Sequence, residues 1–111
     1  MELKWHQRPE IKIRERRKWL LQTYNLTPEQ YNQMFQEQEG RCKICSKHQI
    51  DLPRSLSVDH DHNCCPGDKS CGNCIRGLIC DRCNHGLGHF QDDPELLQKA
   101  INYLKEYLHG E

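Results

Sequence analysis

The stretch VDHDHNCCPGDKSCGNCIRGLICDRCNHGLGHF, residues 58–90, contains the residues that decide the fold. Two short extended segments, around Leu56–His60 and Ile75–Ile79, lie on either side of a long Cys-rich loop, and this pattern fits a hairpin. A short helix is expected to begin near Cys83 and to run toward Phe90. The sequence therefore predicts a small α+β domain in which two strands are followed by a helix.

The composition shows why such a domain needs a staple. The chain has 111 residues, of which 35% are hydrophobic, and its mean hydropathy is −0.97. So small and polar a domain usually needs disulfides or a metal. The chain has no apolar leader and no run near the roughly 20 apolar residues of a membrane span, so we expect a cytoplasmic protein without membrane contact. Cytosolic thiols stay reduced, which favours metal ligands over disulfides.

Two Cys-x-x-Cys knuckles frame the hairpin, CKIC before it and CDRC after it. Four thiolates can surround one Zn²⁺ tetrahedrally, and such a site is structural because it leaves no open position for water. The alternative, four unrelated buried cysteines, would have to match both spacings by chance. The predicted ligands of this structural zinc are Cys42, Cys45, Cys80 and Cys83.

The loop of the hairpin contains four further cysteines, and its glycines and proline allow the sharp turns of a metal knuckle. They can form a second zinc site, although two of them are adjacent and need a bend to point the same way. His62 is an alternative ligand in place of one of them. A reduced loop without metal, or a labile disulfide, are the other interpretations. The four residues are Cys64, Cys65, Cys71 and Cys74.

Four ionisable residues, Asp59 to His62, follow the first predicted strand. Because a strand projects alternate side chains to opposite faces, Asp59 and Asp61 should share one side, and His60 and His62 the other, unless the strand ends there. A carboxylate is a hard ligand for a divalent ion, and a neighbouring neutral imidazole can take a proton from water. That pairing suits metal-assisted phosphodiester hydrolysis. Acids and histidines in a loop are otherwise solvated or salt-bridged.

Asn84 directly follows the last knuckle cysteine. A zinc ion bound there would fix the start of the following helix and aim Asn84 at the hairpin. An acid, a histidine and an amide brought together in this way form a plausible catalytic scaffold.

The flanking segments are predicted to be helical. Thr27, Pro28 and Gln30 form a capping-box signal for a helix that runs to about residue 38, and Gly40 closes it. Asp93 and Pro94 begin a final helix. Its apolar residues recur at helical spacing and predict a face that packs on the core: Leu96, Leu97, Ala100, Ile101, Leu104 and Leu108.

Charge is unevenly distributed although the net charge is zero. Residues 1–20 hold seven Lys or Arg against three acids, and residues 91–111 hold two Lys against five acids. We expect residues 1–23 to form a basic helix or arm, with the segment 8–22 helical, and residues 24–111 to form the zinc-bound domain. A solvated helix face is the alternative. The candidate phosphate contacts are Arg14, Arg16, Arg17 and Lys18 on the arm, and Arg76 and Arg82 near the hairpin.

Together, the motifs CKIC at 42–45, VDHDH at 58–62 and RGLICDRCNHGLG at 76–88 resemble the endonuclease VII branch of the HNH nucleases, a phage recombination family. The segment YNLTPEQYNQMFQEQEGRC at 24–42 is similar to the helix that leads into the first knuckle there. The resemblance covers residues 24–104 and implies the ββα-metal, or His-Me finger, fold. It also implies a phage or prophage origin, with the bacterial cell as host.

The resemblance implies a role for each site residue. Asp59 and Asn84 would hold Mg²⁺ or Mn²⁺, His60 would be the general base, and His62 would lie against the scissile phosphate. The generic HNH pattern has a histidine directly after the last knuckle cysteine, where this chain has Asn84, as in the endonuclease VII branch. His85 is then an exposed helix residue or a phosphate contact, and nothing else supports a ligand pair of His85 with His89.

We therefore expect a metal-dependent endonuclease that hydrolyses DNA phosphodiester bonds, by nicking or by resolving branched DNA. Family members act as intertwined dimers, so a homodimer is implied as well. The alternative function is a non-catalytic zinc module that binds nucleic acid or protein. Such a module would also use the knuckles and the basic arm, but it has no need of the acid-histidine run or of Asn84.

Overall fold

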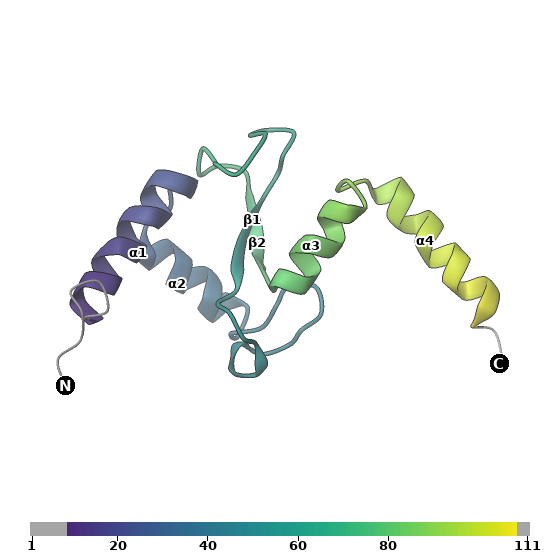
Figure 1. Ribbon diagram of the computed structural model, residues 1–111, viewed down its shortest axis with the longest axis horizontal. Coiled ribbons are helices and arrows are strands. Elements are labelled where there is room, and N and C mark those ends of the chain that lie inside the picture. Colours follow the sequence, from purple (N-terminus) through teal and green to yellow (C-terminus); the bar gives the residue numbers. More distant parts are fainter. Residues whose placement is uncertain (1–8, 109–111) are drawn as a thin grey trace.

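The computed structural model describes residues 9–108, and residues 1–8 of the predicted arm lie outside this range. One antiparallel hairpin is followed by a helix, with two helices on one side of this unit and one on the other (Figure 1). This is the predicted α+β class, a ββα unit flanked by helices. The elements are α1 (Pro9–Tyr24), α2 (Pro28–Glu37), the 3-10 turn η2 (Gln49–Asp51), β1 (Ser57–His60), β2 (Ile75–Ile79), α3 (Asp81–His89) and α4 (Pro94–Tyr107).

The predicted capping signals are confirmed at two helices. Thr27 accepts a hydrogen bond from the backbone N–H of Gln30, and the Gln30 side chain accepts one from Thr27 in return. Asp93 caps α4 in the same position relative to Pro94. Gly40 follows α2 with a φ of +70°, as a helix-terminating glycine does.

The core lies where α1, α2 and the hairpin meet. Tyr31 of α2 donates a hydrogen bond from its hydroxyl to the carbonyl of Leu56, just before β1. Cys42 and Cys80, two predicted ligands of the first zinc site, are also part of this core. The buried apolar residues are Leu20, Leu26, Tyr31, Cys42, Leu56, Val58, Leu78, Ile79 and Cys80.

The hairpin contains an irregularity beside the acid-histidine run. Asp59 pairs with Gly77, whereas His60 pairs with Ile75, so Arg76 is an extra residue on β2. An extra residue of this kind re-aims side chains and increases the local twist. It brings the Arg76 side chain to the side on which Asp59 lies.

Helix α3 begins earlier than predicted. It starts at Asp81 rather than near Cys83, because Cys80 acts as the N-cap and its Sγ accepts a hydrogen bond from the backbone N–H of Cys83. Asn84 therefore lies within the first turn of α3 and not at its start.

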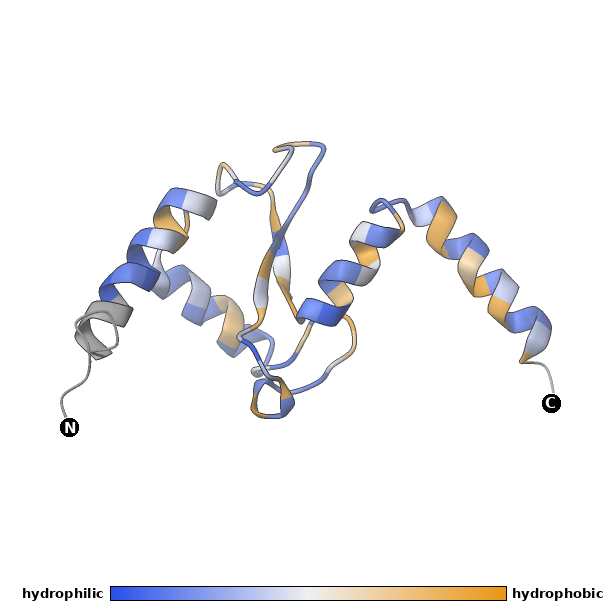
Figure 2. Cartoon of the chain, viewed as in Figure 1, coloured by the Kyte–Doolittle hydropathy of each residue, from blue (hydrophilic) through white to orange (hydrophobic). Residues whose placement is uncertain are grey.

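The prediction of a core-facing stripe on the final helix was wrong. No residue of α4 is buried. Leu96, Leu97 and Ala100 are half-buried, whereas Ile101, Leu104 and Leu108 are exposed by 43%, 55% and 71%. Helix α4 stands away from the hairpin, with orange apolar patches along its length (Figure 2). The radius of gyration is 17.2 Å, against about 13 Å for a compact 100-residue domain. Hydrophobic spacing identified the apolar face of α4 correctly, but no other segment of residues 9–108 buries that face. Within residues 9–108 no helix is long and apolar enough to span a bilayer.

Replacement of Gly72 by alanine should destabilise the domain by about 1–3 kcal/mol. Its φ is +93°, and an added Cβ would lie 2.9 Å from the backbone oxygen of Asn25. The matched control is Gly86→Ala in α3, where an added Cβ meets nothing within 4 Å, and which should stabilise by about 0.5–1 kcal/mol. Urea unfolding measures both, and a Gly72→Ala chain as stable as wild type would contradict the strain.

Candidate active site

The first cysteine cluster is assembled as predicted. The thiol sulfurs of Cys42, Cys45, Cys80 and Cys83, called the knuckle cluster below, all lie within 4.8 Å of one another, a spacing that can hold a metal ion. Burial raises the pKa of Cys42, but backbone N–H donors from Cys45, Cys80 and Ile44 outweigh burial and lower it to about 6. Burial and the neighbouring thiols raise the pKa of Cys83 in the same cluster, so the four thiols do not all favour the metal-binding thiolate form.

The loop cysteines form a second cluster. The sulfurs of Cys64, Cys65, Cys71 and Cys74, called the loop cluster, also lie within 4.8 Å of one another. The adjacent Cys64 and Cys65 do turn toward one point, with their sulfurs 3.9 Å apart. The hydroxyl of Ser70, as the largest influence, lowers the pKa of Cys74 to about 7. His62 is not part of this cluster, because its ring contacts Asp92 instead.

The four residues predicted to be catalytic line one small cavity. Asp59 and His60 at the end of β1, His62 just beyond it and Asn84 of α3 surround a space of about 80 Å³. Asp59 is 7% exposed and His60 4%, so both titratable groups are largely withdrawn from solvent. The other lining residues are Tyr24, Val58, Gly67 and Asp68. The ring centres of His60 and His62 lie 4.5 Å apart. The strand ends at His60, and Asp59 lines the same cavity, so strand alternation does not separate the acid from the histidines.

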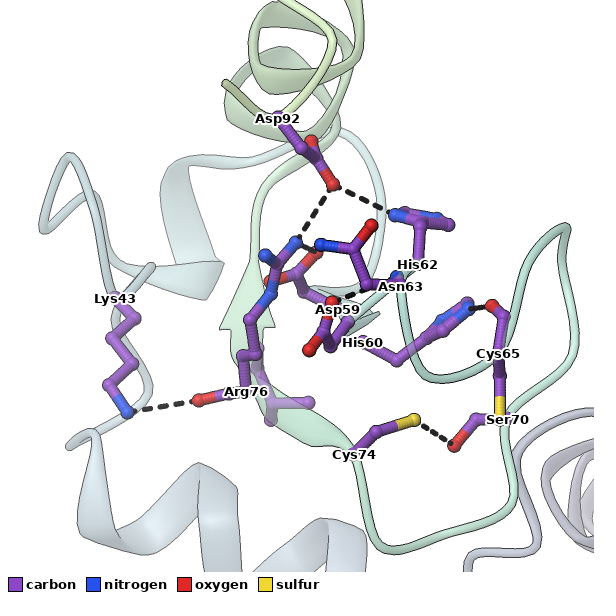
Figure 3. Close-up of polar contacts among 12 residues, drawn as sticks. Lys43, Asp59, His60, His62, Asn63, Cys65, Ser70, Cys74, Arg76 and Asp92 are labelled. Atoms are coloured by element: carbon purple, nitrogen blue, oxygen red, sulfur yellow. Dashed lines mark hydrogen bonds and ion pairs between the residues drawn. The ribbon is translucent and has the colours of Figure 1, made fainter. Parts of the chain in front are cut away.

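The ring of His60 has a defined orientation. Its Nε2 lies 3.0 Å from the carbonyl oxygen of Cys65 (Figure 3). A carbonyl oxygen only accepts, so Nε2 carries the hydrogen and donates it. In the neutral ring Nδ1 then has a lone pair and can accept a proton.

Arg76 joins the site to an acid that the sequence did not single out. Its Nε and Nη2 donate to the two carboxylate oxygens of Asp59 at 2.7 and 2.9 Å, and Nη2 also donates to Asp92 at 3.2 Å. Asp92 in turn lies 2.8 Å from Nδ1 of His62 (Figure 3). The salt-bridged alternative for the acid-histidine run is thus present at Asp59 and His62.

Asp92 escaped prediction because it lies in an acidic segment next to the capping residue Asp93. Its position depends on two consecutive residues with positive φ, Gln91 and Asp92, which the sequence does not signal. Burial raises the pKa of Asp92, but hydrogen bonds from His62 and Arg76 outweigh it, and the net direction is downward. The Asp59 carboxylate, as the largest influence, raises the pKa of Arg76.

The predicted phosphate contacts on α1 are exposed, and some of them pack on α2. The Arg16 guanidinium lies 4.9 Å from the centre of the Tyr31 ring, and Arg17 pairs with Glu29 at 3.5 Å. Arg14 to Lys18 stand roughly 9–15 Å along the helix axis from Tyr24, which lines the cavity. Arg82 lines a separate cavity next to the knuckle cluster, and neither His85 nor His89 lines the cavity around His60.

Comparison with known proteins identifies a family and similar phage proteins. Residues 17–106 match the recombination endonuclease VII family. The chain is 41% identical over 88 residues to the Gene 59 protein of Mycobacterium phage D29, covering 78% of this chain and 48% of that protein. It is 40% identical over 86 residues to the Gene 59 protein of Mycobacterium phage L5, covering 77% and 47%. The chain thus spans about half the length of these relatives.

The solved structures that are similar include the ββα-Me type II restriction endonuclease Hpy99I. It has a TM-score of 0.44 and 36% sequence identity, over 85% of this chain and 48% of that one. The match over residues 17–106 contains the knuckle cluster, the hairpin and α3 in full. The chain belongs to the recombination endonuclease VII family.

Proposed function

We propose that this protein is a metal-dependent HNH endonuclease that hydrolyses phosphodiester bonds in DNA. The observation that carries the proposal is the shared cavity of Asp59, His60, His62 and Asn84, with the His60 ring held so that Nδ1 can accept a proton. Membership of the endonuclease VII family supports the same activity.

The donors around the cavity fit a hard divalent cation. Asp59 provides a carboxylate and Asn84 an amide oxygen, and both line the same space. Asp59 is buried and carries a charge, which a cation must balance, and Arg76 does so in this structure. When bound by Asp59 and Asn84, Mg²⁺ or Mn²⁺ would neutralise charge that develops on the leaving 3′ oxygen.

The protein's own residues would carry the proton transfer and the binding. Nδ1 of His60 takes a proton from the water that attacks phosphorus, while Nε2–H remains bonded to the Cys65 carbonyl. His62, next to His60 and steadied by Asp92, positions the scissile phosphate. Arg14, Arg16, Arg17 and Lys18 bind phosphates farther along the DNA, and Arg76 is a contact closer to the cut.

Both cysteine clusters would bind zinc. The knuckle cluster joins the segment before the hairpin to the start of α3, so zinc there serves the fold. The loop cluster has the same four-thiol spacing. Neither site leaves a position open for substrate, so the catalytic ion is a separate, oxygen-bound one.

The exposed face of α4 supports a homodimer. An exposed apolar stripe on an amphipathic helix is typical of an interaction surface, and no other segment of residues 9–108 buries it. We propose that a second copy of this chain covers the stripe.

His60→Ala should lower nicking of supercoiled plasmid DNA by about 10²–10⁴-fold, because the attacking water loses its base. Zinc content and circular dichroism should match wild type. His89→Ala, from a residue outside the cavity, is the matched control. Activity is compared with and without added Mg²⁺ or Mn²⁺, rather than with a chelator that would also strip zinc. Wild-type-like nicking by His60→Ala would overturn the mechanism, and no metal-dependent cleavage of duplex, branched or single-stranded DNA by wild type would favour the binding module.

In zinc-loaded protein without added Mg²⁺, Arg76→Met should lower the free energy of unfolding by about 1–3 kcal/mol, because it leaves the buried Asp59 carboxylate without its ion pair. The cost is below that of a fully buried pair since the Arg76 side chain is 40% exposed. Added Mg²⁺ should restore part of the loss. Arg54→Met breaks the exposed pair with Asp81 and should cost less than about 0.5 kcal/mol. Urea unfolding of zinc-loaded protein measures these changes, and equal losses in the two variants would refute this account.

Leu104→Glu should shift the protein from dimer to monomer, because it places a charge on the exposed apolar stripe. Light scattering should give twice the chain mass of 13.2 kDa for wild type and the single mass for the variant. Asn102→Glu, on the polar face of α4, should remain dimeric. A wild-type chain that stays monomeric at all concentrations tested would exclude the dimer.

A further inference from the structure

The loop cluster lies next to the proposed general base. The loop between β1 and β2 leaves His60 and returns to the sheet at Ile75, and all four of its cysteines lie between these points. The backbone carbonyl of Cys65 accepts the Nε2–H of His60 at 3.0 Å (Figure 3). One member of the cluster is therefore also the residue that orients His60.

The same loop forms a wall of the cavity. Gly67 and Asp68 line it together with Asp59 and Asn84. Tyr24 lines the same cavity as Asp68, and burial, followed by the charge of Asp68, raises the pKa of Tyr24. The position of residues 65–68 therefore sets both the orientation of His60 and the shape of the cavity.

The ends of the loop are anchored, but its middle is not. The Asp61 N–H donates to the Cys74 carbonyl, and the Ser70 N–H donates to the carbonyl of Thr23 in α1. Asn25 donates from its side chain to the Cys71 carbonyl. Between these anchors, within the part of the chain that is described, no hydrogen bond involves the backbone of residues 66–69, and no apolar residue of the loop is buried.

The hydrogen bond between the Cys65 carbonyl and His60 is too weak by itself to order the loop. A hydrogen bond of this kind contributes about 0.5–1.5 kcal/mol net. Ordering a single residue's backbone costs about 1–2 kcal/mol, and several residues of the loop must be ordered. A metal ion that joins thiols from both arms of the loop removes this freedom through covalent-strength bonds.

We propose that a zinc ion at the loop cluster holds the Cys65 carbonyl against His60 and thereby keeps the general base in its working tautomer. This inference rests on the proposed role of His60. Cys65 is a positioning residue that acts through the His60 ring, and the ion itself touches no substrate. Loss of the loop zinc leaves the knuckle cluster and the core intact, but it frees the ring of His60 to turn or to exchange its N–H between the two nitrogens.

The test replaces a ligand remote from His60. Cys71→Ser removes one thiol whose residue has no contact with the histidine ring, and Asn73→Ser, an exposed neighbour in the loop, is the matched control. Zinc per chain, measured by elemental analysis, should fall from two to one in Cys71→Ser and remain two in the control. Cobalt-substituted protein should lose half of its thiolate charge-transfer absorption. Circular dichroism should not change.

The decisive readout is the tautomer of His60, observed by long-range ¹H–¹⁵N NMR. Wild type and Asn73→Ser should show the Nε2–H form, and Cys71→Ser a mixture, with nicking reduced at least tenfold. Cys64→Ser should behave in the same way. The proposal is overturned if wild type holds one zinc, if the tautomer does not change in Cys71→Ser, or if that variant loses both ions and its fold. If the tautomer changes but no chain cleaves DNA, the coupling stands and the proposed nuclease function fails.

Discussion

The convergence of four thiols at the knuckle cluster is the constraint on which the rest of this structure depends. Cys42 and Cys80 are core residues as well as candidate ligands, so the thin apolar core and the staple are one assembly. Cys80 also caps α3, and Cys83 immediately precedes Asn84. Through these links the cluster determines where α3 begins and which residue of its first turn faces the hairpin. The apolar contacts of α3 with the core are few: Cys83 and Leu87 pack against it, and no residue of the helix is fully buried.

The irregularity of the hairpin at Arg76 also shapes the candidate active site. The extra residue allows a guanidinium to reach the buried Asp59, and Asp92 connects the same arginine to His62. Two carboxylates therefore share one arginine beside a histidine. Arg76 thus has two acceptors, Asp59 and Asp92. In this structure the ion pair with Arg76 balances the charge of the buried Asp59 side chain.

Features that depend on local chemistry were predictable from sequence, and features that depend on distant packing were not. The knuckle spacing, the capping box at Thr27 and the adjacency of Cys83 and Asn84 are local, and the structure agrees with each. The partnership of Arg76 with Asp59 needs the register shift, and the place of Asp92 needs two positive-φ residues. Helical spacing predicted the apolar stripe of α4, but spacing does not show which surface, if any, packs against that stripe.

The two cysteine clusters have similar chemistry but very different spans along the chain. The loop cluster lies within the eleven residues 64–74, whereas the knuckle cluster joins residue 42 to residue 83. Closing the longer span costs roughly 1 kcal/mol more in chain entropy, and it requires the hairpin to form. An unfolded chain can therefore already bind zinc at the loop cluster, and an ion that binds both states adds little to the free energy of unfolding. A zinc ion at the knuckle cluster would therefore favour folding, whereas one at the loop cluster would bind before folding and add little to stability.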